Sequence, residues 1–309
     1  FPVNSMQTLR VGLFLLVLVM LPLSSCKKEG PEAKKTTIGV TLQTRAHVFY
    51  KDLEEGLRKA ADKYGYDLIL TAGEFDLGKQ SAQIEDFITR KVDAIVVVPV
   101  DSRGIGPAIR KANEAGIPVF TSDIAAQEGQ VICHIASDNV AGGRLAGEFM
   151  AKALGGKGTL AIIGQPTVTS VMDRVQGFRE AISKYPGMSI VTEVNGEGVR
   201  DKALQAASDV LQANPGLSGI FGINDDSALG TLDAVRQFKR GNIVIVGYDA
   251  TPPAVDAIKK NTALKADVIQ YPNKIGENTI ERIRDHFAGK QVPPIDPVEV
   301  GIVDITTLK

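Results

Sequence analysis

Polar and aromatic side chains collect directly after the apolar segments of this chain, where a ligand could be bound. His47, Phe49 and Tyr50 follow the first such segment, and Asp123 follows the fourth. Carboxylates accept hydrogen bonds from neighbouring hydroxyl groups, and guanidinium and amide groups donate them. The C–H face of a sugar ring packs on an aromatic ring. The mixture therefore predicts a site for a small hydroxylated molecule. The positions after predicted strands are Arg45, His47, Phe49, Tyr50, Asp101, Asp123, Arg174, Asn224, Asp225, Tyr248, Asp249 and Gln270.

The apolar segments that precede these residues alternate with amphipathic segments from Thr36 onward, which is typical of repeated β–α–β units. Residues 94–98 are apolar throughout, as expected of a parallel strand covered on both faces. Leu53, Leu57 and Ala60 are spaced to lie on one face of a helix. We predict an α/β fold, in which ligands bind beyond the carboxyl ends of the strands. The predicted strands are 37–42, 66–70, 94–98, 118–120 and 131–135, then 159–163, 189–194, 219–222, 243–247 and 263–269.

The first 35 residues differ in kind from the rest. The apolar run 11–23 after Arg10 is too short to span ~30 Å of hydrocarbon as a helix, and it fits the core of a signal peptide covering residues 1–25. The run ends in Leu-Ser-Ser-Cys26, which resembles the lipobox of bacterial lipoproteins. We expect lipidation at Cys26, a charged tether over 26–35, and a location outside the cytoplasmic membrane at the periplasm or cell surface. Cys133 is then left without an intrachain disulfide partner.

Charge and motifs argue against other functions. A net charge of −1 without basic blocks beyond the tether disfavours nucleic acid as a partner. Gly196-Glu197-Gly198 lacks the third glycine of a dinucleotide loop, because Asp201 occupies that place. The three His lack metal-ligand spacing, and no Gly-x-Ser-x-Gly elbow occurs. We expect a binding protein with no catalytic residue, metal or cofactor. The remaining ~275 residues suffice for two lobes of ordinary domain size.

Several short motifs, in order, resemble the ribose-binding branch of periplasmic sugar-binding proteins. They are His134-Ile135-Ala136-Ser137-Asp138-Asn139-Val140, Asn224-Asp225, Val246-Gly247-Tyr248-Asp249, and Gln270 before Pro272. The resemblance extends over essentially all of 36–309. It implies the type I periplasmic binding fold: two Rossmann-like lobes with parallel sheets, joined by a three-strand hinge. We predict crossovers near 137–139, 270–271 and 297–301. The lobes are then 36–137 plus 271–298, and 138–270 plus 299–309.

The resemblance also implies ligand contacts. Phe49 and Tyr50 match the family's aromatic pair, Asp123 its carboxylate in one lobe, and Arg174 its arginine in the other. Asn224, Tyr248, Asp249 and Gln270 match its remaining polar and aromatic positions. The departures are His47 and Val98 in place of Asn, Gln43 in place of Ser, Ile124 in place of Arg, and Gly198 near a capping aromatic. Because sites built around particular hydroxyls discriminate steeply, the ligand stays open among ribose, other pentoses, hexoses, polyols and modified sugars.

These predictions describe a monomer that captures its ligand by hinge closure and delivers it to the membrane-embedded permease of an ABC importer. The alternative is a sensor that passes its closed form to a chemoreceptor or sensor kinase. Individual residues also have other interpretations. Asp249 could cap the helix that follows it, Arg174 could form a surface ion pair, and His47 could be an exposed loop residue. A cytoplasmic repressor is disfavoured, because an export signal stands where its DNA-binding helices would lie.

Overall fold

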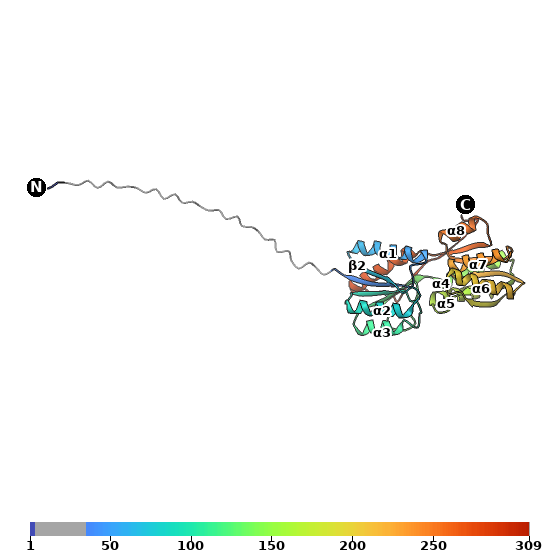
Figure 1. Ribbon diagram of the computed structural model, residues 1–309, viewed down its shortest axis with the longest axis horizontal. Helices are drawn as coiled ribbons and strands as arrows, with labels where there is room; N and C mark the ends of the chain where they lie inside the picture. The colour runs from blue at the N-terminus through green and yellow to red at the C-terminus, as the bar shows by residue number, and fades with distance from the viewer. Residues whose placement is uncertain (4–34, 309) are drawn as a thin grey trace. The chain divides into compact units, whose positions relative to one another are not determined.

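The computed structural model describes residues 1–3 and 35–308, and the compact unit begins at Lys35. The signal peptide and Cys26 lie outside the described residues. Two six-stranded sheets, each with its own helices, make up the compact unit (Figure 1). Among the described residues, no helix combines the length and the apolar character needed to cross a membrane. The prediction of an α/β fold with two lobes is confirmed.

The first sheet is wholly parallel, with strand order β11-β5-β4-β3-β1-β2. Its strands alternate their side chains between two cores. Val40 and Val96 belong to the core beneath α1 and α9, and Ile95 and Val97 to the core beneath α2 and α3. The elements are β1 (Thr37–Leu42), α1 (Val48–Tyr64), β2 (Asp67–Ala72), α2 (Leu77–Thr89), β3 (Ala94–Val97), α3 (Gly106–Glu114), β4 (Val119–Ser122), β5 (His134–Ser137), α9 (Pro272–Phe287) and β11 (Ile295–Val298).

The second sheet has the order β12-β10-β9-β8-β6-β7, with β12 antiparallel to β10 and the other pairs parallel. Ile162 and Phe221 pack in the core shared with α4 and α5, whereas Ile163 and Ile220 pack toward α6 and α7. The elements are α4 (Asn139–Ala153), β6 (Lys157–Gly164), α5 (Thr169–Ile182), β7 (Gly187–Asn195), α6 (Arg200–Ala213), β8 (Leu217–Gly222), α7 (Asp225–Gln237), β9 (Val244–Asp249), α8 (Pro252–Lys259), β10 (Leu264–Ile269) and β12 (Gly301–Asp304).

Helix ends follow local chemistry. The Asp76 side chain accepts a hydrogen bond from the Lys79 amide and starts α2, and Asp138 does the same for Ala141 at the start of α4. Gly65, with φ +71°, ends α1 in the left-handed conformation that glycine adopts without strain. One predicted strand is displaced: β5 is His134–Ser137, not 131–135. Residues 131–133 form an irregular approach to it, although Ile132 still donates its amide to Val119.

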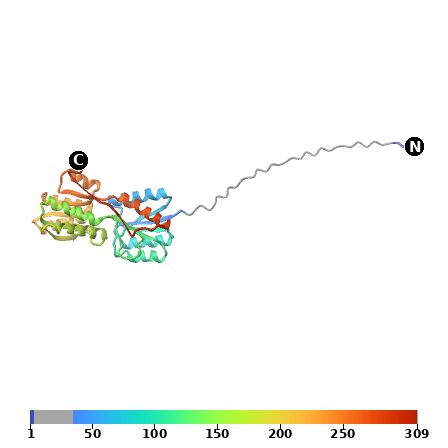
Figure 2. The same cartoon turned by 180° about the vertical axis from the view of Figure 1, so that it is seen from behind.

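The chain passes between the sheets three times. β5 of the first sheet leads into α4 of the second group, β10 of the second sheet leads into α9, and β11 leads into β12. The last passage is the dark red strand that runs from one sheet to the other in Figure 2. These passages lie at the positions where the sequence predicts crossovers, whereas the residue-by-residue lobe boundaries remain a prediction.

Candidate functional site: a cleft between the two sheets

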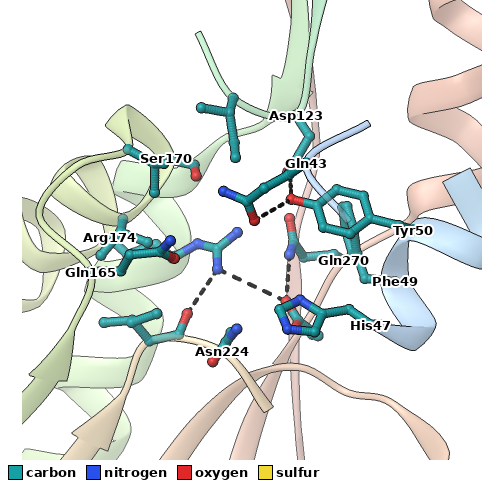
Figure 3. Close-up of a pocket in the computed structure, with 15 residues that line it drawn as sticks. Gln43, His47, Phe49, Tyr50, Asp123, Gln165, Ser170, Arg174, Asn224 and Gln270 are labelled. Atoms are coloured by element: carbon teal, nitrogen blue, oxygen red, sulfur yellow. Dashed lines mark hydrogen bonds and ion pairs between the residues drawn. The ribbon is translucent and has the colours of Figure 1, made fainter. Parts of the chain in front are cut away.

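A pocket lies where loops after strands of both sheets converge (Figure 3). The first sheet and the start of α1 contribute what we call the first wall: Gln43, His47, Phe49, Tyr50, Asp123 and Ile124. Loops and helix starts around the second sheet contribute the second wall: Gln165, Val168, Ser170, Val171, Arg174, Ile223, Asn224 and Asp249. Gln270, at the crossover after β10, completes the lining.

The first wall is organised around Asp123 and Tyr50. The Tyr50 hydroxyl donates to Asp123 Oδ2 at 3.0 Å and lies 3.2 Å from Gln43 Oε1. Asp123 follows β4 with φ +63° and is 4% exposed. Burial raises the pKa of Asp123 to about 6, although Arg174, the Tyr50 hydroxyl and His47 act in the opposite direction. Asp123 Oδ1 is buried without a hydrogen-bond partner in the described structure, so it can accept from a ligand hydroxyl.

Aromatic rings form the rest of the first wall. Phe49 and Tyr50 meet edge to face, with ring centroids 5.2 Å apart. The His47 ring stacks nearly parallel to Tyr50 at 6.0 Å. Figure 3 shows all three at the start of α1, facing the second wall. These rings offer apolar faces beside the buried carboxyl group, which is the arrangement that suits a sugar ring.

Arg174 dominates the second wall and is only 4% exposed. Its Nε donates to Asn139 Oδ1 at 2.9 Å, and its Nη1 donates to the Ile223 carbonyl at 2.7 Å. The guanidinium carbon lies 3.9 Å from the centre of the Tyr248 ring. The hydrogen bonds of Arg174 within residues 35–308 use Nε and Nη1, so Nη2 is left to donate to a ligand. The alternative of a surface ion pair is wrong, because the side chain is buried.

Asp249 and Gln270 meet beside Arg174. Gln270 Nε2 donates to Asp249 Oδ1 at 2.6 Å, and Arg174 Nη1 lies 3.9 Å from the same oxygen. Burial raises the pKa of Asp249 to about 7, against the opposing charge of Arg174. The helix that follows has Thr251 at its N-cap, without a side-chain hydrogen bond, so Asp249 does not cap it. Gln270 Oε1 is a second buried acceptor without a partner in the described chain.

Two predicted site residues have additional or different roles. Asn224 lines the pocket, but its Oδ1 caps α7 by accepting from the Ser227 amide, and its Nδ2 donates to the Gly198 carbonyl. Tyr248 does not line this pocket. It is fully buried behind Arg174, and its hydroxyl donates to Asn139 Oδ1 at 3.3 Å, so the structure places it as support for Arg174 rather than on the cavity surface.

Gln165 and Ser170 also line the pocket, although neither is among the site residues predicted from the sequence. Gln165 directly follows β6, so the same strand-end rule finds it. Ser170 lies in the first turn of α5, whose start the spacing of apolar residues leaves undefined. By contrast, Arg45 and Asp101 do not line this pocket. Arg45 forms an ion pair with Glu54, and Asp101 Oδ1 accepts hydrogen bonds from the amides of Arg103 and Gly104.

Direct contacts join the two lobes beside the pocket. The Thr169 hydroxyl bridges the amide and carbonyl of Ala125, and the Thr169 amide donates to Ser102 Oγ at 3.0 Å. The Ser102 amide donates to the Thr167 carbonyl. At another edge, His47 Nε2 lies 3.0 Å from Asp226 Oδ2. The lobes are therefore closed on each other around the pocket.

The arrangement is a pocket lined from two lobes, and known proteins with a similar sequence share this architecture. A family model for the periplasmic binding protein domain matches residues 38–291. The ribose import binding protein of Salmonella typhimurium is 32% identical over 270 residues, covering 87% of this chain and 90% of its own length.

Solved structures of similar proteins share the fold. A solute-binding protein from Actinobacillus succinogenes with bound D-allose is 28% identical, with a TM-score of 0.81, covering 89% of this chain and 99% of that one. Another, from Agrobacterium vitis with bound α-D-tagatopyranose, is also 28% identical, with a TM-score of 0.83 and coverages of 89% and 96%. The chain belongs to the periplasmic binding protein family, among the sugar-binding solute-binding proteins of ABC transporters. The predicted resemblance is thus confirmed.

Proposed function

We propose that this protein captures a small sugar or polyol in the cleft by closure of its two lobes and delivers it to the permease of an ABC importer. The observation that carries the proposal is the pairing of open acceptors with a fixed donor across one buried pocket. Asp123 Oδ1 and Gln270 Oε1 lack partners in the described residues, and Arg174 faces them from the second wall. Hydroxyl groups satisfy both kinds of group, because each one donates and accepts.

The aromatic first wall and the apolar side chains around the polar groups support a ring-shaped ligand. Phe49 contributes a ring face, and Ile124, Val168 and Val171 line the pocket without hydrogen-bonding groups. The relatives named above bind D-allose and α-D-tagatopyranose or are named for ribose import. We propose that His47, Phe49, Tyr50, Asp123, Arg174, Asn224, Asp249 and Gln270 contact the ligand, with Tyr248 holding Arg174.

Closure follows from the division of these groups between two lobes. A ligand gripped by Asp123 from one side and by Arg174 and Asp249 from the other stabilises only the closed state, because the open state cannot make both sets of contacts. The contacts of Thr169 with Ser102 and Ala125 add to that state. We further propose that the protein is a monomer without catalytic activity or cofactor, exported and held at the membrane by lipid on Cys26.

The test is a thermal-shift panel of pentoses, hexoses, deoxysugars, polyols and inositols on the compact unit from Lys35 onward. A ligand at about 100 times its dissociation constant adds ~2.7 kcal/mol to the free energy of unfolding. Small-angle scattering with and without the best ligand then reports closure. Absence of a shift with every compound would contradict sugar binding, and turnover of the bound sugar would contradict the non-enzymatic proposal.

A further inference from the structure

Two buried carboxyl groups outside the pocket grip the turn that carries Asp249. Asp225, at the start of α7, accepts at Oδ2 a hydrogen bond from the Thr251 amide at 2.6 Å. Asp267, inside β10, accepts at Oδ1 from the Ala250 amide at 2.9 Å. Asp225 is 4% exposed and Asp267 is fully buried. Neither lines the pocket, yet together they bind two successive amides just after Asp249.

The backbone conformation of this turn is one that must be stabilised by its surroundings. Asp249 has φ +122° and Ala250 has φ +54°, a region that residues other than glycine rarely adopt. Backbone of this kind persists only where the surroundings hold it in place. Asp249 Oδ2 also lies 3.4 Å from the Asp225 amide, which links the carboxylate to the start of α7. The direction in which Asp249 points therefore depends on the two carboxyl groups behind it.

The second oxygens of these carboxyl groups pose a chemical problem. Asp225 Oδ1 and Asp267 Oδ2 are both buried without a hydrogen-bond donor in the described structure. Two ionised carboxylates only accept, so neither can satisfy the other. The two carboxyl groups lie next to each other, because they accept from the successive amides of Ala250 and Thr251. One proton between them turns one group into a donor and satisfies both oxygens. Gly247 leaves room for this pair, because a Cβ there would lie 2.2 Å from Asp267 Oδ2.

We propose that Asp225 and Asp267 share one proton and act as positioning residues, which clamp the turn at Ala250 and Thr251 so that Asp249 faces the ligand. This inference rests on the proposed sugar-binding function for its consequence, but the shared proton stands on the geometry of the pair. Neither residue touches the ligand. Their effect on affinity passes entirely through the orientation of Asp249.

Electrostatics of the neighbourhood gives the clamp a pH dependence. The charged groups that act on Asp267 from outside the pair are Asp249 and Arg174. Burial raises the pKa of Asp267 to about 7, and burial together with the neighbouring Asp267 raises the pKa of Asp225 well above its ordinary value. A carboxyl group whose pKa is raised on folding binds its proton more tightly in the folded state. The stabilisation from the shared proton is therefore present at low pH and lost as the pH rises through these values.

The test compares sugar affinity of the wild type, Asp267→Asn and Asp267→Ala from about pH 6 to about pH 9. Asparagine keeps an acceptor for the Ala250 amide and supplies a permanent donor to Asp225. We expect wild-type affinity to fall at alkaline pH by at most about tenfold per pH unit, and Asp267→Asn to retain its affinity there. Asp267→Ala, which removes the acceptor, is expected to bind weakly at every pH. Superimposable wild-type and Asp267→Asn profiles would overturn the proposal.

A second measurement does not need a sugar. Carbon-13 NMR of the aspartate carboxyl groups at neutral pH should show a protonated carboxyl at Asp225 or Asp267 in the wild type, and an ionised Asp225 in Asp267→Asn. The amide signals of Ala250 and Thr251 should shift in Asp267→Ala and much less in Asp267→Asn. Full ionisation of Asp225 and Asp267 in the wild type would overturn the shared proton. Failure of the wild type to bind any sugar, with these NMR signatures intact, would instead count against the proposed function.

Discussion

The two walls of the cleft both present polar groups to the pocket, but they differ in how many contacts hold those groups in place. In the first wall, one hydroxyl group, that of Tyr50, is the hydrogen-bond donor to Asp123. In the second wall, Arg174 is held by Asn139, by the Ile223 carbonyl and by the ring of Tyr248. The comparison teaches that the second wall is a preformed frame, whereas the first wall depends on single contacts. Each variant below tests that difference.

The largest effect is expected from Arg174→Met, which keeps much of the side-chain volume and removes the charge. Asp249 would lose the neighbouring guanidinium group, and the ligand would lose its fixed donor. Removal of one partner from a buried charge pair costs about 2–5 kcal/mol of binding free energy. Isothermal titration calorimetry measures the loss. The matched control is Arg179→Met on the same helix, which disrupts only an exposed ion pair with Glu193. Equal affinities in both variants would contradict the role of Arg174.

A smaller loss of binding affinity is expected from Tyr50→Phe in the first wall. Asp123 Oδ2 would lose its donor, and an unsatisfied buried acceptor costs about 1–3 kcal/mol. The pKa of Asp123 should rise further from about 6, because the Tyr50 hydrogen bond lowers it. Calorimetry and an NMR titration of Asp123 measure the two effects. Tyr64→Phe on the same helix is the control, since its hydroxyl contacts Glu281 and Arg284. An unchanged Asp123 titration would show that the first wall does not depend on this hydroxyl.

Removal of a contact that joins the two lobes should lower the binding affinity more modestly. Thr169→Val removes the hydroxyl bridge to Ala125 but keeps the shape of the side chain. Because a hydrogen bond contributes about 0.5–1.5 kcal/mol, each one lost should lower the affinity by roughly two- to thirteenfold. Scattering should show a more open ensemble without ligand. In Thr167→Val the backbone contact with Ser102 is preserved, so this variant should behave as the wild type. Identical affinities for the two variants would contradict the bridge's role in closure.

The smallest effect on binding affinity is expected from disruption of the pair formed by His47 and Asp226. Burial lowers the pKa of His47, but the hydrogen bond to Asp226 and the charges of Asp226, Asp249 and Asp123 outweigh it, so the pKa is raised above 6.5. The pair therefore stabilises closure at low pH, and its contribution disappears as the pH rises through the raised pKa.

Asp226→Asn should weaken binding by at most about 1 kcal/mol near pH 6, since the Asp226 side chain is partly exposed. Relative to the wild type, this difference should vanish at alkaline pH, above the raised pKa of His47. Affinity measured across pH checks the trend. Asp233→Asn on the same helix, which breaks the contact with Arg200, should show no such trend. A difference that is constant across pH would exclude protonated His47 as the cause.

The sequence predicts the fold well, because each strand and helix can be recognised from the pattern of apolar residues within its own short segment. Uninterrupted apolar runs such as 94–98 define buried parallel strands, and the strand-end rule brings Asp123 and Asp249 to one pocket. The sequence does not predict the roles of side chains that depend on contacts between distant segments. Tyr248 and Asp249 are neighbours in the chain, but alternation along β9 turns the first into the core behind Arg174. Asp267 lies within a strand, so no strand-end rule identifies it. The lipid anchor at Cys26 remains a prediction.

The second passage between the sheets has a consequence for how the chain reaches its native state. The first sheet gains its outer strand β11, and its α1-side core gains α9, only from residues 272–298. Such contacts between the start and the end of a chain slow folding, because a long loop must close before they form. The amino-terminal lobe therefore cannot finish folding during synthesis until residues 272–298 have left the ribosome. Before that moment, an export machinery that threads extended chains would meet a first lobe that still lacks α9 and β11.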